Sequence, residues 1–496
     1  MTVNMTNEKH KSISFRRLWG MHFFIILLLS GCAANWGDAV TATRNNPDAL
    51  SVANVLAEVE PGPWPKHNWW EAFGDPQLDE LMMEALSGSP TLRVAEARVR
   101  RASAIAGSVA AVRSPQLNLD GTSIYQRFTE KGAVSPSFAG EKRSVNLLTL
   151  GLNYDIDLWG KNRAAYKAAL GEIRVAEVES AAARLQLTTA IAATYVRLNY
   201  IFEQYDVEAA ILKQQEQVAE LTAKRVEAGI DSAVELNHIK GMSASTKTNM
   251  RAQQEQIDLS RNQLAALVGA APNRGTSIVA PVLLSHKKLA LPTDLPSELI
   301  GRRPDVVAQM WRIETMTERV AEAKAAFYPN VNLVSFAGFD SIGIEHILSP
   351  GSRVFGVGPA ITLPLFDGGR LRSNLGVREA EFDESIERYN GLIVNAVREV
   401  ADQVVSWQGI EAQQREEQEA VAGFKEANRL ALLRYRQGLA DYLTVLATEE
   451  ALLKERRREV TLNTRKFEIS IALTKALGGG YLPDPVSAGP GQKGNL

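Results

Sequence analysis

The chain has 496 residues, of which 45% are hydrophobic and 23% charged, and its formal net charge is −2 at pH 7. This composition lies in the globular range and excludes wholesale disorder, and the near-neutral charge gives no electrostatic reason to expect a nucleic-acid partner. The only cysteine, Cys32, excludes a disulfide framework, and the scattered histidines show no metal-binding spacing, so we expect no cofactor and no metal.

Residues 1–31 are predicted to be a lipoprotein signal peptide. Basic residues precede the short apolar run Phe23–Leu29, and small residues follow it, as in an export signal that is too short to span a membrane. The stretch Leu29–Cys32 matches the bacterial lipobox, in which cleavage leaves Cys32 as the N-terminus carrying S-diacylglycerol and N-palmitoyl groups. A plain signal peptide with an incidental cysteine is the alternative. We expect residues 32–68 to form a lipid-anchored linker.

The rest of the chain contains an internal repeat. The segment Pro90–Pro115 aligns with Pro304–Pro329, and further on Gly229 aligns with Gly438. The offset is 214 residues for the first match and 209 for the second, and such co-linear matches at a long and nearly constant offset indicate a duplication. We place the two repeats at 69–285 and 286–480 and expect a disordered tail at 481–496.

Each repeat is predicted to contain a helical segment ending before a proline, two β-segments, a very long helix and a return helix. In the first repeat these are 76–112, 117–126, 147–158, 160–229 and 232–268, and in the second 302–328, 331–340, 353–366, 371–437 and 441–477.

The β-segments are longer than most strands of soluble proteins. In 147–158, leucines at 148, 150 and 152 alternate with small or polar residues, and this period-two pattern continues for more than ten residues. It fits a transmembrane strand of about 9–11 residues better than a strand of a soluble sandwich, which remains the alternative. Four strands cannot close a barrel, and open edges are not tolerated in lipid. The strands therefore predict an oligomer, and three chains would supply an even number of strands, twelve.

The helices are also unusually long. No proline interrupts the segment from Gly160 to Gly229, which would extend roughly 100 Å at about 1.5 Å per residue. Gly229 and Gly438 are expected to cap the ends of the two long helices. The helical pattern alone does not distinguish a hollow tube from a solid coiled-coil rod. A structural lipoprotein that uses such a rod to tether the outer membrane is therefore one possible function, and it is the alternative to a hollow channel.

Five motifs carry a family resemblance. They are Trp69–Asp79, Leu295–Asp305, Leu363–Arg370, Arg434–Gly438 and Ala476–Gly480, and they resemble TolC/OprM-type outer membrane efflux proteins, including the NodT-like efflux lipoproteins. The resemblance implies an α+β membrane protein. It would be a homotrimer with a twelve-stranded outer-membrane β-barrel that continues into a long α-helical barrel in the periplasm.

The same resemblance implies a transport function and not an enzyme. Such a duct would be the exit channel of a tripartite pump of RND or related type, joined through a periplasmic adaptor protein to an inner-membrane transporter. It would export drugs, solvents or other toxic small molecules across the outer membrane. No nucleophile–base pair, metal-ligand set or phosphate-binding loop competes with this interpretation.

The resemblance also places a gate at the periplasmic helix tips, beside Gly229 and Gly438. Tyr435 and Glu235 match the positions of a hydrogen-bonded latch, for which a solvated surface pair is the alternative. Leu443 matches an apolar gate position. The last gate residues, Thr444 and Ala447, stand where TolC-like members have aspartates, so we do not expect an acidic ring.

The repeat offset places one histidine near the gate. His238 aligns with Ala447 of the other half, and it could make closure sensitive to pH or could simply be solvated.

Overall fold

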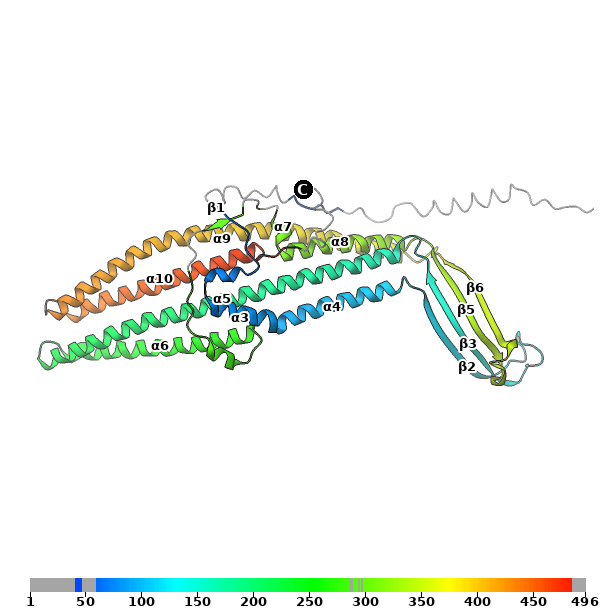
Figure 1. Ribbon diagram of the computed structural model, residues 1–496, viewed down its shortest axis with the longest axis horizontal. Coiled ribbons are helices and arrows are strands. Elements are labelled where there is room, and N and C mark those ends of the chain that lie inside the picture. Colours follow the sequence, from blue (N-terminus) through cyan, green and yellow to red (C-terminus); the bar gives the residue numbers. More distant parts are fainter. Residues whose placement is uncertain (1–40, 47–58, 285–288, 293–294, 296–297, 484–496) are drawn as a thin grey trace, which may run out of the picture. The chain divides into compact units, whose positions relative to one another are not determined.

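A computed structural model describes residues 41–46, 59–284, 289–292, 295 and 298–483 (Figure 1). Cys32, the predicted signal peptide and residues 484–496 lie outside the described residues, and the predicted linker is described only in part. The described residues divide into two compact units, one containing 104–170 and 313–385 and the other containing the described parts of 43–103, 171–312 and 386–483. None of the helices in the described ranges combines the length and hydropathy needed to cross a bilayer.

The duplication is visible in pairs of helices of equal length. The helices α4 (Pro90–Ala111) and α8 (Pro304–Ala325) each have 22 residues. The long helices α5 (Lys161–Glu227) and α9 (Arg370–Arg436) each have 67, and the return helices α6 (Ala233–Leu267) and α10 (Tyr442–Ala476) each have 35. The predicted repeat of one fold is therefore confirmed. In Figure 1, α6 runs back along α5 and α10 runs back along α9.

A proline divides the predicted helical segment 76–112, whereas the predicted segment 302–328 corresponds to α8, which begins at Pro304 and is preceded by a short helix. Helix α3 (Pro76–Gly88) ends before Pro90, and the short α7 (Leu299–Arg302) ends before Pro304. Each proline begins the following helix, where its missing N–H group costs no hydrogen bond.

One unit contains a four-stranded antiparallel sheet, and the number of strands agrees with the prediction. The strands are β2 (Gln116–Arg127), β3 (Lys142–Asp155), β5 (Asn330–Ile342) and β6 (Arg353–Thr362). Their order is β2-β3-β5-β6, so the central pair β3–β5 joins the two repeats. Within the described chain, the outer edges of β2 and β6 have no strand partner.

Strands β3 and β6 end earlier than predicted because the residues after them cap helices. Asp157 accepts hydrogen bonds from the backbone N–H groups of Asn162 and Arg163 at the start of α5, at 3.1 and 2.8 Å. In the second repeat, Asp367 accepts from Gly369 and Leu371 in the same way, at 3.0 and 2.9 Å. A carboxylate at a helix N-terminus satisfies free N–H groups and interacts favourably with the helix dipole.

The first sequence motif forms the core of the helical unit. The 3-10 helix η3 (Trp69–Phe73) buries Trp69, Trp70 and Phe73 against α3 and the middle of α5. Asp75 caps α3 and also accepts a 2.6 Å hydrogen bond from the hydroxyl of buried Tyr195.

The second motif is organised around Arg303, which is 7% exposed. Its guanidinium contacts Asp305 and Glu399, each at 2.7 Å, and donates to the backbone carbonyl of Ala476 at 3.2 Å. One arginine thus joins α8, α9 and the end of α10.

The minor elements are β1 (Glu60–Pro61), which pairs with β4 (Ala290–Leu291), and the 3-10 helices η4 (Pro272–Ser277), η5 (Ile344–His346) and η6 (Pro350–Ser352).

Candidate functional site: the helix tips

The two long helices end in the same way. Gly229 follows α5 with φ +74°, and Gly438 follows α9 with φ +75°, a left-handed conformation that favours glycine. The next N–H group in each loop, that of Ile230 or Leu439, donates at 2.8 Å to a carbonyl five residues back. This is the Schellman motif, which satisfies the free carbonyl groups at a helix end. The predicted role of both glycines as helix caps agrees with this geometry.

The return helices begin with side-chain caps. Ser232 and Glu235 form a capping box at the start of α6, in which the Glu235 carboxylate accepts from the Ser232 backbone at 3.0 Å and from its hydroxyl. The Ser232 hydroxyl is the main reason that the pKa of Glu235 is lowered. At the start of α10, Asp441 accepts from the backbone and the hydroxyl of Thr444, at 2.9 and 2.6 Å.

Tyr435 links the tips of the two hairpins, α5/α6 and α9/α10. Its side chain is fully buried, and its hydroxyl donates to Asp231 at 2.8 Å and lies 2.8 Å from the Thr222 hydroxyl. Within the chain, the expected partner Glu235 is therefore replaced by Asp231. The reason is local, because the capping box at the start of α6 already uses the Glu235 carboxylate.

Arg225 completes this latch. Its guanidinium holds Asp231 through two nitrogens, at 2.8 and 3.0 Å, and lies 4.6 Å from the centre of the Tyr435 ring. The hydrogen bond from Arg225 is the main cause that lowers the pKa of Asp231 below its ordinary value, while burial raises the pKa of the Tyr435 hydroxyl. Hydrogen bonds to a charged acceptor are stronger than neutral ones. We call Thr222, Arg225, Asp231 and Tyr435 the tip latch.

An apolar cluster lies against the latch. Its buried members come from all four helices of the two hairpins and are Val218, Ile239, Tyr435, Tyr442 and Val445. Burying one large apolar side chain in this way stabilises the folded protein by about 1.5–3 kcal/mol. The two hairpins are therefore joined at their tips by both packing and hydrogen bonds.

Four apolar side chains at the tips remain exposed. Ile230 and Val234 of the first hairpin are 63% and 74% exposed, and Leu439 and Leu443 of the second are 65% and 63% exposed. The predicted gate residues Leu443, Thr444 and Ala447 all lie on exposed positions in the first turns of α10. His238 is exposed as well, with its ring 6.2 Å from that of Tyr442.

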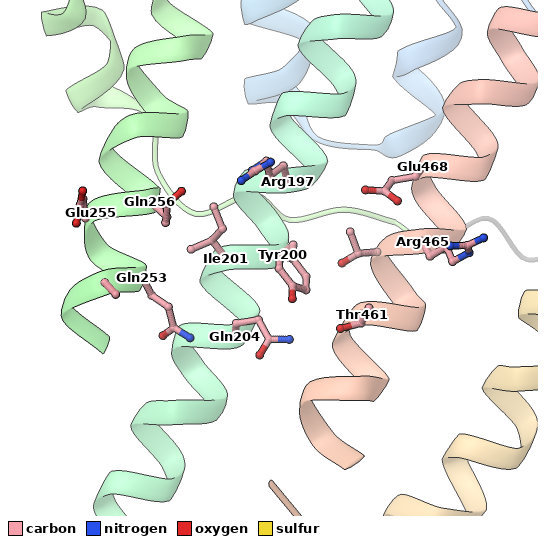
Figure 2. A pocket seen from close by; sticks show the side chains of 12 residues that line it. Arg197, Tyr200, Ile201, Gln204, Gln253, Glu255, Gln256, Thr461, Arg465 and Glu468 are labelled. Carbon is pink, nitrogen blue, oxygen red and sulfur yellow. The ribbon is translucent and has the colours of Figure 1, made fainter. Parts of the chain in front are cut away.

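A cavity of about 620 Å³ lies further along the bundle between α5, α6 and α10 (Figure 2). Figure 2 shows Arg465 pointing away from the α5 side chains, so Arg197 and Arg465 do not converge on one point. The lining is otherwise rich in amides and hydroxyls, and it suits hydration better than selective binding. Among the described residues, no group of three or more histidine, cysteine or acidic side chains could hold a metal ion.

Comparison with known proteins identifies the family. The family model described as "Outer membrane efflux protein" matches residues 81–270 and 295–479. The chain belongs to the outer membrane efflux protein family. It is 32% identical over 472 residues to the multidrug resistance outer membrane protein MdtP of Escherichia coli (strain K12), covering 92% of this chain and 95% of that protein.

Two further similar proteins support the same family. The chain is 32% identical over 362 residues to the fusaric acid resistance protein FusA of Burkholderia cepacia, which covers 72% of this chain and 68% of that protein. The crystal structure of the outer membrane protein VceC from Vibrio cholerae matches with a TM-score of 0.79 and 38% identity, covering 84% of this chain and all of that one. The prediction of an outer-membrane efflux channel, and not an enzyme, is thereby confirmed.

Within this efflux family member, sequence reasoning found some tip residues and missed others. It found Tyr435 and both glycines. It missed Asp231 and Arg225, although one sequence signal was available: Ser232 and Glu235 have the Ser-x-x-Glu spacing of a capping box, which assigns that glutamate to the helix start.

Proposed function

We propose that three copies of this chain form the gated exit duct of a tripartite efflux pump in the outer membrane. The observation that carries this proposal is the four-stranded sheet with two unpaired edges, β2 and β6. Free strand edges are hydrogen-bonding templates, and a lipid environment demands that they be paired. Pairing β2 of one copy with β6 of the next would close a twelve-stranded barrel.

The side chains of the edge strands support the same assembly. Leu117 and Leu119 of β2 are 60% and 69% exposed, and Phe355, Val357 and Ile361 of β6 are between 68% and 84% exposed. These residues lie at alternate positions, so each edge strand presents an apolar face. An apolar outer face is what a lipid-facing barrel requires.

The remaining partners follow from the family. We propose that a periplasmic adaptor docks on the helical part and connects it to an inner-membrane transporter, which supplies the energy. The names of the relatives, multidrug resistance and fusaric acid resistance, favour toxic small organic molecules as the exported class. Lipidation of Cys32 would hold the N-terminus at the outer membrane.

At the periplasmic tips, we propose that the tip latch holds the duct closed. Leu443, with its neighbours Thr444 and Ala447, would meet its counterparts from the other two copies and narrow the tube with apolar contacts. The exposure of Leu443 in a single chain, 63%, supports this role because covering an exposed large apolar side chain stabilises the assembly.

The assembly is tested by measuring the mass of the purified protein in detergent. The proposal predicts a trimer. A monomer that stays folded would contradict the proposed duct.

The lipid anchor has its own test. Labelling cells with a palmitate analogue should mark the parent protein, while Cys32→Ser should remain unlabelled and retain its uncleaved leader. An unlabelled parent protein would leave Cys32 as an incidental cysteine.

A further inference from the structure

A buried polar layer crosses the interface between the two hairpins, next to the apolar tip cluster. Gln214 of α5 donates to the Asn428 side chain of α9 and to the Glu449 carboxylate of α10, at 3.3 Å each. Asn428 and Glu449 are 5% and 3% exposed. One glutamine thus connects both helices of the second hairpin to the first.

Glu449 is the one acid of this layer, and it is incompletely paired. Its Oε1 atom is buried and has no hydrogen-bond partner among the described residues. A buried carboxylate needs hydrogen bonds or a cation to remain charged, whereas the neutral acid tolerates burial at much lower cost. Burial raises the pKa of Glu449, and the hydrogen bonds from Gln215 and Gln214 offset this only in part.

Among the described residues, no lysine or arginine forms an ion pair with Glu449, and none contributes to the shift of its pKa. From α5 it meets the amides of Gln214 and Gln215. These two glutamines are in turn hydrogen-bonded to Asn428 of α9 and to Thr246 of α6. From its own helix, the charge of Glu450 raises its pKa further, and Tyr442 lies nearby as a neutral phenol.

Two basic residues on the neighbouring helices pair with other acids. Lys247 of α6 pairs with Glu216 of α5 at 3.0 Å, and both side chains are more than half exposed, at 57% and 55%. Arg429 of α9 pairs with Glu426 at 2.8 Å, also at the surface. The layer therefore offers hydrogen bonds to Glu449 and no counter-charge.

We propose that Glu449 is a proton-sensitive residue of the gate: in its neutral form it holds the two hairpins together, and its ionisation loosens the polar layer and favours opening. This inference rests on the proposed function as a gated duct. It differs from a histidine switch because His238 is exposed at the tip, whereas Glu449 lies inside the interface that must separate.

The direction of the pH effect follows from the burial of Glu449. In the closed tip the pKa of Glu449 is raised above its ordinary value of 4.5, while in an opened, hydrated interface it returns toward that value. The contribution of Glu449 to closure is therefore complete below the ordinary value and is lost as the pH rises through the raised one. Each unit of difference between the two pKa values changes the closed-to-open ratio about tenfold.

The test compares channel conductance across pH in planar bilayers for the parent, Glu449→Gln and Glu450→Gln. Glu450 is the matched control, since it is the adjacent acid and is exposed. The open fraction of the parent should rise as the pH is raised from about 4.5 to about 8. The open fraction of Glu450→Gln should rise as well, starting from a lower pH, because the charge of Glu450 helps to raise the pKa of Glu449. Glu449→Gln should keep the low, acid-like open fraction throughout. A Glu449→Gln channel with the pH profile of the parent would overturn the inference while leaving the duct intact.

A second measurement makes the inference independent of gating. Infrared spectra of the parent, recorded in steps upward from about pH 4.5, should keep the C=O stretch of a protonated carboxylic acid above the pH at which ordinary glutamates ionise, because burial raises the pKa of Glu449. Glu449→Gln should remove this component and Glu450→Gln should retain it. If the spectra of the parent and Glu449→Gln do not differ in this band, Glu449 is not the protonated group, and the inference is overturned. Folded trimers that conduct in no variant at any pH would instead overturn the proposed duct.

Discussion

The Tyr435 hydroxyl of the second hairpin donates a 2.8 Å hydrogen bond to Asp231, which lies in the loop of the first hairpin. The two residues are 204 positions apart in the chain, so this bond exists only while the hairpin tips are together. Arg225 fixes the acceptor, and Thr222 fixes the hydroxyl. The tip latch is therefore a small hydrogen-bonded unit whose loss should release one hairpin from the other.

The first prediction concerns which acid is the latch acceptor. Removing the Tyr435 hydroxyl with Tyr435→Phe, or the charge of its partner with Asp231→Asn, should weaken closure by about 1–3 kcal/mol, because each loses a charge-assisted hydrogen bond. Single-channel recordings should show a larger open fraction in both. Glu235→Gln is the matched control, since glutamine also serves in a capping box, and it should behave like the parent.

The second prediction concerns the pH range of the latch. The pKa of Asp231 is lowered, chiefly by the hydrogen bond from Arg225. Its contribution to stability is therefore present above the ordinary aspartate value of 3.8 and is lost as the pH falls through the lowered one. The difference in thermal unfolding midpoint between the parent and Asp231→Asn should be constant from about pH 5 to pH 8 and shrink below about pH 4. A difference that grows on acidification would contradict this assignment.

The third prediction uses two glycines of the same helix hairpin. Gly438→Ala should destabilise by about 1–2 kcal/mol, since alanine is strained in the left-handed conformation that Gly438 adopts, with φ +75°. Gly423→Ala, within the helical part of α9 and with open space around it, should instead stabilise by about 0.5–1 kcal/mol. Denaturant unfolding of both variants beside the parent measures the two changes in the free energy of unfolding. Equal changes of the same sign would contradict the left-handed helix cap at Gly438.

The fourth prediction concerns Arg303, which joins α8, α9 and α10. Arg303→Met should cost about 1–3 kcal/mol, because it leaves the buried Ala476 carbonyl without the hydrogen bond from Arg303 and removes the counter-charge of the partly exposed Asp305 and Glu399. The control Arg429→Met removes a surface pair with Glu426 and should change stability by less than about 1 kcal/mol. The midpoints of thermal unfolding decide between these values.

Periodicity predicted the elements well because the long helices and strands are regular. The alternation of leucines at 148, 150 and 152 specified β3, and the proline-free segment from Gly160 to Gly229 specified α5 to within a few residues. The strand ends were less accurate, since Asp157 and Asp367 act on helices that begin several residues later.

The side-chain partners were harder to predict because they depend on how the two hairpins face each other. Gln214 meets Asn428 and Glu449 across 214 and 235 residues, and no local pattern specifies which face of α5 turns toward α10. The acceptor of the Tyr435 hydrogen bond was also hard to predict, because the position of Asp231 depends on Arg225, whose side chain reaches across the loop. Here, however, the sequence did contain a signal, because the Ser232–Glu235 spacing assigns Glu235 to the helix start.

The central claim is that this chain forms a duct held closed at its helix tips by the latch around Tyr435. Planar-bilayer conductance of the purified parent, compared with an Asp231→Asn/Tyr435→Phe double variant, tests it most directly. The account predicts a small and mostly closed parent channel and a clearly larger conductance in the double variant. Equal conductance of the two folded trimers would contradict the latch, and no conductance in either would contradict the duct itself.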